Sequence, residues 1–308
     1  MLIGQSPQVQ KTRKMIREIA KTDDPVLLVG DVGVGKSMIA SEIHRKSKRK
    51  NKPFVMVNCT GIKKDKSDGD LFGEQIDAPN GIERKIGLLE QANKGILYLE
   101  NVDELVPEFQ QHFLNIIKDG KFFKPSDNSF TDINIRIISA TSNPDIAKSD
   151  QFRKDLLAEL NTFTINVPPL REHKQDIPLL FSHFLEKYCE ELDHEIPPVP
   201  ADIFESLMEY EWTGNVSELR NAVRNLILMS PEGELSVEYL PFEVKKHPFE
   251  TLLGKDLPDA ISEVERYLIK KALRKFAGNQ TKAAHALNVS EAALRYKMKK
   301  YGLTRKTF

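Results

Sequence analysis

Several features common in secreted and membrane proteins are scarce or missing in this chain. Its 308 residues include two cysteines, Cys59 and Cys189, which are too few for a disulfide framework. No apolar run approaches the roughly 18 residues of a membrane-spanning helix, and no signal peptide is evident. The seven histidines lack the spacing of metal ligands. We therefore expect a soluble, cytoplasmic protein with no membrane partner and no histidine- or cysteine-based metal site.

The net charge of the whole chain is zero, but the charges are distributed unevenly along it. The chain has 45 basic and 45 acidic residues. From Arg266 to the end, however, 12 basic residues accompany a single acid, Glu291, so the remaining chain carries an excess of 11 acids. A basic C-terminal module on an acidic body suggests a polyanionic partner for the tail. A solvated, charged helix face is the alternative.

A glycine-rich loop follows an apolar run near the start of the chain. Residues 26–29 read Val-Leu-Leu-Val and residues 30–37 read Gly-Asp-Val-Gly-Val-Gly-Lys-Ser, the G-x-x-x-x-G-K-[ST] pattern. Glycines let main-chain N–H groups approach phosphates, the lysine reaches the β- and γ-phosphates, and the serine hydroxyl can ligate Mg²⁺. The pattern predicts binding of ATP or ADP with Mg²⁺, and a glycine-rich turn with a chance lysine is the alternative. The residues expected to hold the nucleotide here are Gly30, Asp31, Val32, Gly33, Val34, Gly35, Lys36, Ser37 and Met38.

Strand and helix patterns alternate over the first 170 residues, which predicts a parallel α/β sheet. A helical pattern with several prolines follows. We expect an α/β subdomain over 1–175, a helical subdomain over 176–240, a linker over 241–256 and a helical domain over 257–308. The predicted strands are 26–29, 54–57, 96–99, 135–140 and 163–167, and the predicted helices include 8–20, 37–46, 86–92 and 110–119.

The last domain has the pattern of a helix–turn–helix. An apolar stripe from Leu257 to Phe276, at steps of three and four residues, predicts an amphipathic helix. Asn288 stands where the turn needs a left-handed residue, and Ser290 is a good N-cap for the helix after it. A hairpin for protein contacts is the alternative to DNA binding. The predicted contacts to double-stranded DNA are Thr281, Ser290, Arg295, Tyr296, Lys297, Lys299 and Lys300.

The order of these parts resembles the bacterial enhancer-binding proteins, AAA+ activators of sigma-54 RNA polymerase with a Fis-type DNA-binding domain. The resemblance implies an α/β fold: an AAA+ P-loop parallel sheet with a helical lid subdomain, plus a C-terminal all-α Fis-type helix–turn–helix. It also implies that Ile3 and Gly4 lie near the adenine, that the C-terminal domain forms homodimers, and that the AAA+ part forms a hexameric ring or a dimer. Besides the phosphate loop, the motifs are Ile3-Gly4-Gln5-Ser6-Pro7, Leu71-Phe72-Gly73, Leu88-Leu89-Glu90-Gln91-Ala92, Val167-Pro168-Pro169-Leu170-Arg171-Glu172, Trp212-Thr213-Gly214-Asn215-Val216 and Gly278-Asn279-Gln280-Thr281.

The chain departs from this family where ATP is hydrolysed. The family's second nucleotide motif ends a strand with Asp-Glu; the Asp helps to hold Mg²⁺ and the Glu polarises the attacking water. Here the strand ends in Glu100-Asn101. Glu100 can still face Mg²⁺, together with Ser37, but Asn101 cannot accept a proton. Asp103 or Glu104 could substitute, although nothing in their spacing supports it.

Three further positions of the resemblance are changed. The family's F-R-x-D-L-x-x-R segment gives arginine fingers to a neighbouring subunit; Arg153 keeps the first, but Glu159 occupies the second. An arginine finger can be worth roughly 10³–10⁵ in rate. Ser217 stands where the family has a nucleotide-contacting arginine, and Arg220 is almost a full turn further on. The family's sigma-54-contacting loop aligns with residues 77–82, which lack its Phe and Thr.

We therefore predict a DNA-binding transcriptional regulator whose AAA+ module binds ATP or ADP but is impaired in hydrolysis and in contact with sigma-54 RNA polymerase. One alternative is a working activator that uses ATP to remodel the polymerase. Another is a P-loop protein with a different function, such as replication-initiator loading, in which the helix–turn–helix only tethers the protein to DNA. The target genes, the signal, the choice of ring or dimer, and a different physiological nucleotide all stay open. The altered catalytic set comprises Glu100, Asn101, Arg153, Glu159 and Ser217.

Overall fold

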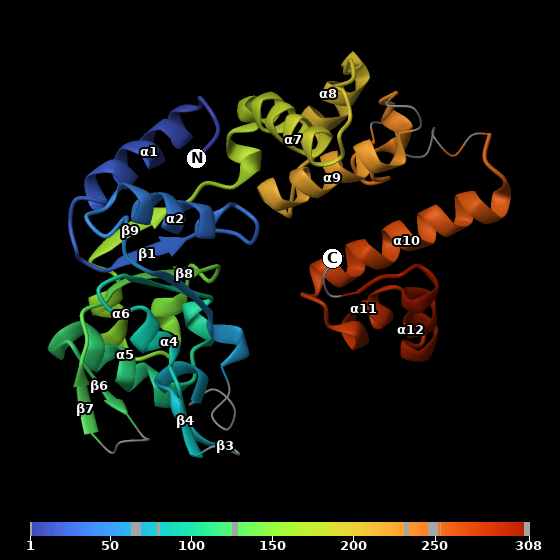
Figure 1. Cartoon of the computed structure of the whole chain (residues 1–308). Coiled ribbons are helices and arrows are strands. Elements are labelled where there is room, and N and C mark those ends of the chain that lie inside the picture. The colour runs from blue at the N-terminus through green and yellow to red at the C-terminus, as the bar shows by residue number, and fades with distance from the viewer. Residues whose placement is uncertain are drawn as a thin grey trace. The chain divides into compact units, whose positions relative to one another are not determined.

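A computed structural model of the chain is shown in Figure 1. The structure describes residues 2–62, 69–78, 81–124, 129–230, 234–245, 252 and 254–304. The chain forms two compact units, Met1–Phe184 with Glu211–Asn221, and Leu185–Tyr210 with Ala222–Phe308.

The first unit contains a five-stranded parallel sheet. Its order is β2 (Phe54–Asn58), β5 (Ile96–Glu100), β8 (Arg136–Thr141), β1 (Val26–Val29) and β9 (Phe163–Asn166). The predicted parallel α/β fold is confirmed, and the predicted strands agree with these bounds to within one residue. Because β8 lies between β1 and β5, the ends of β8 and β5 lie beside the loop that follows β1.

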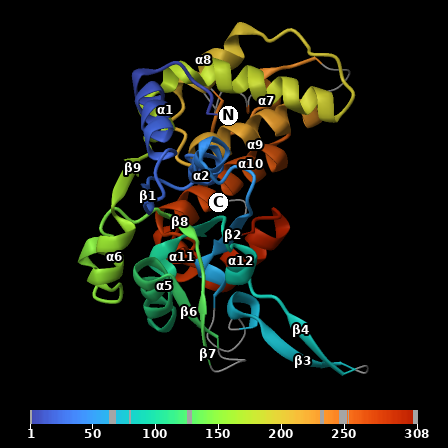
Figure 2. The same ribbon diagram turned by 60° about the vertical axis from the view of Figure 1, so that its left-hand side comes forward.

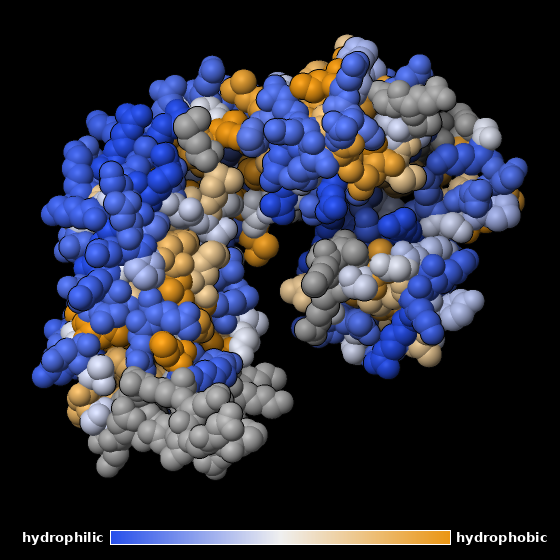
Figure 3. Space-filling model, in the orientation of Figure 1, coloured by the Kyte–Doolittle hydropathy of each residue, from blue (hydrophilic) through white to orange (hydrophobic). Residues whose placement is uncertain are grey.

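Alternate residues of the central strands enter two apolar cores, one on each face of the sheet. Leu97 and Leu99 pack in one core with side chains of α5 (Pro107–Asp119) and α6 (Lys154–Leu160). Ile96 and Tyr98 pack in the other with side chains of α1 (Pro7–Ile19) and α2 (Lys36–Lys46). The outer face of α1 is hydrophilic (Figure 3). Each fully buried aliphatic side chain contributes about 1.5–3 kcal/mol relative to an exposed one, so these cores fix the strand ends that carry the site.

Two β-hairpins in the first unit have no counterpart among the predicted strands. β3 (Glu74–Ala78) pairs antiparallel with β4 (Gly81–Lys85), and β6 (Lys121–Lys124) pairs antiparallel with β7 (Ser129–Asp132). These short strands are rich in polar residues and lack a clear apolar alternation. The β3–β4 hairpin projects away from the five-stranded sheet (Figure 2). It includes most of the segment aligned with the sigma-54-contacting loop, although Pro79 and Asn80 lie outside the described residues.

Helices dominate the rest of the chain. Besides α1, α2, α5 and α6, the described α-helices are the short α4 (Leu88–Gln91), α7 (Ile177–Glu191), α8 (Ala201–Glu209), α9 (Asn215–Met229), α10 (Leu257–Lys275), α11 (Gln280–Ala286) and α12 (Glu291–Lys300). The first residues of the expected linker are packed: Phe242 and Val244 are buried, and the Phe242 ring meets Tyr267 of α10 with ring centroids 5.5 Å apart.

The three C-terminal helices share a small apolar core that includes Leu273, Ala284 and Leu294. Asn288 has a left-handed φ of 53° in the turn between α11 and α12. The Ser290 hydroxyl accepts the Ala293 N–H at 3.1 Å and caps α12. The expected helix–turn–helix is therefore formed, with its turn residue and its cap at the predicted positions.

Candidate nucleotide site and nucleic-acid interface

The glycine-rich loop joins β1 to α2 with two residues in left-handed backbone conformations. Gly33 has φ 82° and Gly35 has φ 96°. A Cβ on Gly33 would lie 2.2 Å from the Gly214 carbonyl oxygen, whereas one on Gly35 would meet nothing within 4 Å. The open side of the loop is therefore at the N-terminus of α2, where free N–H groups and the helix dipole favour an anion.

Lys36 is the central cation of this loop and is only 8% exposed. Its Nζ donates to the Gly30 and Asp31 carbonyls at 2.6 and 3.0 Å, and to the Ser142 hydroxyl at 2.8 Å. Burial is the largest influence and lowers the pKa of Lys36 below its ordinary value. The negative charges of Glu100, Asp31 and Asp103 oppose this shift. A phosphate oxygen could replace the neutral carbonyls as a stronger, charge-assisted partner of this ammonium group.

The start of α9 is hydrogen bonded to the same loop. Asn215 is fully buried, accepts the Leu170 N–H at 2.8 Å and donates to the Val32 carbonyl at 2.9 Å. The Ser217 N–H donates to the Gly33 carbonyl at 3.1 Å. Ser217 therefore lies against the loop and offers a hydroxyl where the family has a guanidinium, whereas Arg220 is exposed further along α9.

The carboxyl end of β5 carries the altered pair Glu100 and Asn101. Asn101 adopts a left-handed conformation, with φ 53° and ψ 51°. Its Nδ2 donates to Asn58 Oδ1 at 3.1 Å and to the Thr60 hydroxyl at 3.3 Å. Asn58 is paired with Glu100 across the β2–β5 ladder. The amide of Asn101 is thus engaged with the end of β2, and it has no basic group for a water proton.

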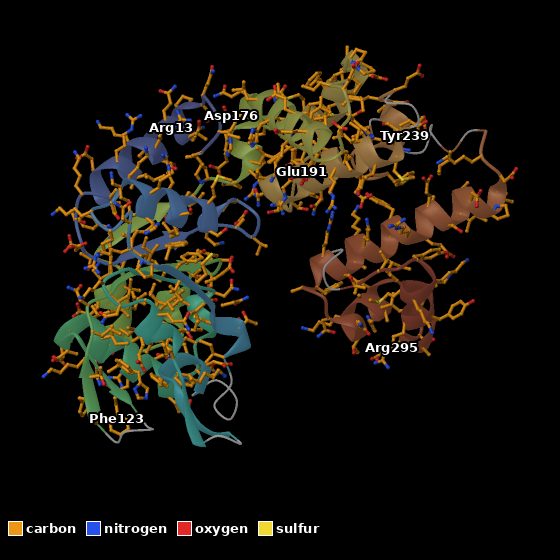
Figure 4. The ribbon with its side chains drawn as sticks, viewed as in Figure 1. Arg13, Phe123, Asp176, Glu191, Tyr239 and Arg295 are labelled. Carbon is orange, nitrogen blue, oxygen red and sulfur yellow. The ribbon has the colours of Figure 1, made fainter. Side chains whose placement is uncertain are left out.

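The N-terminal segment, expected near the adenine, is tied to the start of α7. Gly4 has φ 133°, and a Cβ there would lie 2.7 Å from an Asp176 carboxylate oxygen. That carboxylate accepts the Gln5 and Ser6 N–H groups at 2.6 and 2.9 Å. Arg13 donates to the carbonyls of Leu2 and Gly4, and Figure 4 labels both Arg13 and Asp176. Ile3 and Gly4 therefore belong to an anchored segment.

The residues expected to act on a neighbouring subunit lie at α6. Arg153 makes a two-point contact with Asp155, at 3.0 and 2.7 Å, and both side chains are accessible. An exposed ion pair of this kind contributes little to stability. The Arg153 guanidinium can therefore leave Asp155 to contact another anion. Glu159 lies 3.5 Å from the Lys118 ammonium group. The surface therefore offers one guanidinium and one carboxylate at the two positions where the resemblance implies arginine fingers.

The described residues include no group of three or more His, Cys, Asp or Glu side chains that could hold a metal ion. Magnesium with a nucleotide does not need one, since it is usually bound by one or two carboxylates together with phosphates and water. Ser37, half-buried in the first turn of α2, and Glu100 fit this requirement. Among the described helices, none is both long enough and apolar enough to cross a membrane.

The basic residues of α12 fall into two groups. Arg295, Lys299 and Lys300 are exposed, as is Tyr296, and Figure 4 labels Arg295 on this helix. Arg295 also donates to Glu291 at 3.1 Å within the same helix, an exposed pair. Lys297 instead donates to Glu265 of α10 at 2.6 Å, and this contact raises its pKa. The sequence pattern treated these cations alike because the partner of Lys297 is 32 residues away. Thr281 is exposed in α11, and Ser290 is engaged as the cap described above.

Three family descriptions match successive parts of the chain. They are the sigma-54 interaction domain over residues 2–166, the AAA+ ATPase lid domain over 171–253, and the bacterial regulatory protein, Fis family, over 260–301. The chain belongs to the sigma-54 interaction domain family of AAA+ proteins, the enhancer-binding proteins, with a Fis-type helix–turn–helix.

Individual relatives agree with this family. The chain is 31% identical over 300 residues to the transcriptional regulatory protein ZraR of Escherichia coli K12, covering 96% of this chain and 68% of that protein. It is 34% identical over 310 residues to a signal-transduction and transcriptional-control protein of Clostridium beijerinckii, covering 98% and 48%. A crystal structure of NtrX from Brucella abortus with ADP has a TM-score of 0.72 at 29% identity, covering 98% and 69%. The chain thus spans about half to two thirds of the length of these relatives.

Proposed function

We propose that this protein is a DNA-binding transcriptional regulator whose AAA+ module binds ATP or ADP with Mg²⁺. The observation that carries the proposal is the phosphate loop, with a buried Lys36 and an open helix N-terminus. Membership of an AAA+ family also supports nucleotide binding. NtrX, which shares the fold, has been crystallised with ADP and with ATP. The nucleotide would be held by residues 30–38, with Ile3 and Gly4 near the base and Ser37 and Glu100 toward the metal.

We further propose that ATP hydrolysis and the contact with sigma-54 polymerase are impaired. Asn101 presents an amide in the position of the general base, Glu159 reverses a finger charge, and Ser217 replaces a third cation. Nucleotide would then bias the assembly state rather than power remodelling, because a ligand that prefers one state stabilises it. The alternative, an ATP-driven sigma-54 activator, is favoured by the family matches over residues 2–166, 171–253 and 260–301.

Double-stranded DNA and a second copy of the chain are the proposed partners. The exposed cations of α12 suit DNA phosphates. On α10, Leu257, Ile261 and Leu268 are 71%, 48% and 44% exposed and belong to one apolar stripe. This stripe suits a homodimer of the C-terminal domain and hence palindromic sites. A hexameric ring of the AAA+ part follows from the family alone.

Steady-state phosphate release by the pure chain, with and without DNA, tests the impaired ATPase. We expect turnover far below about 1 s⁻¹, an ordinary enzymatic rate. Turnover near that rate, abolished by Lys36→Ala, would contradict the proposal and favour the active alternative. Transcription from a sigma-54 promoter then tests the polymerase contact. Truncation at Lys255 should abolish a DNA gel shift, and an unaffected shift would contradict the DNA-binding role of residues 257–308.

A further inference from the structure

A second carboxylate lies near the phosphate loop, outside the sequence motifs. Asp103 is in the short 3-10 helix Val102–Glu104, immediately after the left-handed Asn101. The Thr141 hydroxyl donates to Asp103 Oδ1 at 2.6 Å. Thr141 is the last residue of β8 and is fully buried. One oxygen of the carboxylate is therefore fixed to the central part of the sheet.

The position of Thr141 relates Asp103 to the phosphate loop. Thr141 is paired with Val29, and its carbonyl accepts the Gly30 N–H at 3.2 Å. The next residue, Ser142, accepts a hydrogen bond from Lys36 Nζ. Asp103 is thus anchored on the strand end that contacts the loop lysine. Its charge, like that of Glu100, acts to raise the pKa of Lys36.

The other oxygen of Asp103, Oδ2, accepts no hydrogen bond from the residues that the structure describes, and the side chain is only half-buried. A fixed anionic oxygen without a protein donor suits a hydrated cation. Magnesium keeps several of its waters in proteins and is commonly held by one or two carboxylates plus phosphates. Carboxylates that contact metal-bound water also contribute to metal affinity.

We propose that Asp103 is the second carboxylate of the magnesium–nucleotide site, beside Glu100, and that it accepts hydrogen bonds from water bound to the Mg²⁺ that accompanies ATP. This inference rests on the nucleotide binding proposed above. Asp103 restores a second negative charge for the metal, in place of the one lost at Asn101. It does not restore a base at the position of Asn101.

Calorimetric titration of ATP into the full chain, with saturating Mg²⁺ and with a chelator, tests the proposal. In Asp103→Asn, the gain in ATP affinity that Mg²⁺ confers should fall about tenfold. Affinity without Mg²⁺ should stay the same or rise, because a negative charge beside the phosphates has been removed. A merely structural role would lower affinity in both conditions.

Two other variants serve as controls. Glu104→Gln removes an exposed acid from the same turn and should leave both affinities unchanged. Thr141→Val keeps the charge of Asp103 but removes its anchor, so it should lower the Mg²⁺-dependent gain without strengthening Mg²⁺-free binding. Thermal unfolding verifies that each variant is folded.

An undiminished gain in Asp103→Asn, or an equal loss in both conditions, would overturn the inference. Wild-type chain that binds no ATP would overturn it together with the proposed nucleotide site. Rapid ATP hydrolysis by the wild type would contradict only the impaired ATPase and would leave the affinity result standing.

Discussion

The phosphate loop and the end of β5 lie at the same edge of one sheet, but they depend on different chemistry. A loop of this kind holds a phosphate group mainly through main-chain N–H groups, a helix N-terminus and one lysine. The proposed role of the end of β5 depends instead on the side chains of Glu100 and Asn101. Main-chain geometry tolerates sequence change, provided that the glycines remain, whereas exchanging one side-chain functional group removes a chemical step.

This difference explains how binding and hydrolysis could diverge in a single site. The Asn101 side chain is one methylene shorter than the glutamate of the family and makes two hydrogen bonds to the end of β2. These bonds hold the amide at the sheet edge without a carboxylate. The same substitution removes proton-accepting ability, for which the fold offers no compensation at that position.

The largest expected effect comes from restoring an acid at this position. We predict that Asn101→Glu raises ATP turnover about 100-fold, because general-base catalysis typically contributes roughly 10²–10⁴ in rate. Phosphate release at saturating ATP measures the change. Asn101→Gln, which has the same length without a carboxylate, is the matched control. Equal rates in the two variants would show that the amide is not the limiting defect.

Removing Lys36, the cation of the phosphate loop, tests nucleotide binding as opposed to hydrolysis. We predict that Lys36→Ala lowers ATP affinity by about 10- to 100-fold, since a hydrogen bond to a charged group is worth about 1.5–3 kcal/mol. Titration calorimetry measures the affinity. Lys46→Ala, at the opposite end of α2, keeps the helix and removes an equal charge. Affinity that is the same in the two variants would remove the phosphate-loop argument.

Much of this arrangement follows from the sequence because its signals are local. The apolar strand Val26–Val29, the glycine loop and the cap Ser290 each depend on neighbouring residues, and the structure places them as predicted. The hairpins β3–β4 and β6–β7 were missed because short polar strands carry little periodicity.

Contacts between distant residues could not be predicted in the same way. Asp103 meets Thr141 only because β8 lies between β1 and β5, a strand order that spacing does not reveal. The ion pair of Lys297 with Glu265 likewise requires the packing of α12 against α10.

This ion pair allows the cations of α12 to be separated by experiment. We predict that Lys299→Ala weakens DNA binding and lowers the slope of log affinity against log salt by about one, because one phosphate contact is lost. Lys297→Ala should mainly lower the melting temperature and should leave the slope nearly unchanged. Filter binding or fluorescence anisotropy across a salt series measures both. Identical slopes in the two variants would contradict the division of roles.

The smallest expected effect concerns the anchor of the N-terminal segment. Burial opposes ionisation of Asp176, but hydrogen bonds from the Ser6 hydroxyl and from the N–H groups of Gln5 and Ser6 outweigh it and lower its pKa. An acid whose folded pKa lies below its unfolded value stabilises the fold above the unfolded pKa. That contribution is present above about pH 4 and is lost as the pH falls through the lower, folded pKa.

We therefore predict that Asp176→Asn lowers the free energy of unfolding by about 2 kcal/mol at neutral pH, the scale of hydrogen bonds to a charged group. The difference from wild type should begin to shrink below about pH 4, because the unfolded wild-type chain then takes up a proton at Asp176, and it should disappear as the pH falls through the lower, folded pKa. Urea unfolding at pH 7, 5 and 3 measures this convergence. Glu172→Gln, an exposed acid four residues earlier, is the control and should show little difference at any pH. A deficit in Asp176→Asn that stays constant down to pH 3 would show that the carboxylate charge does not hold Gly4 and its neighbours in place.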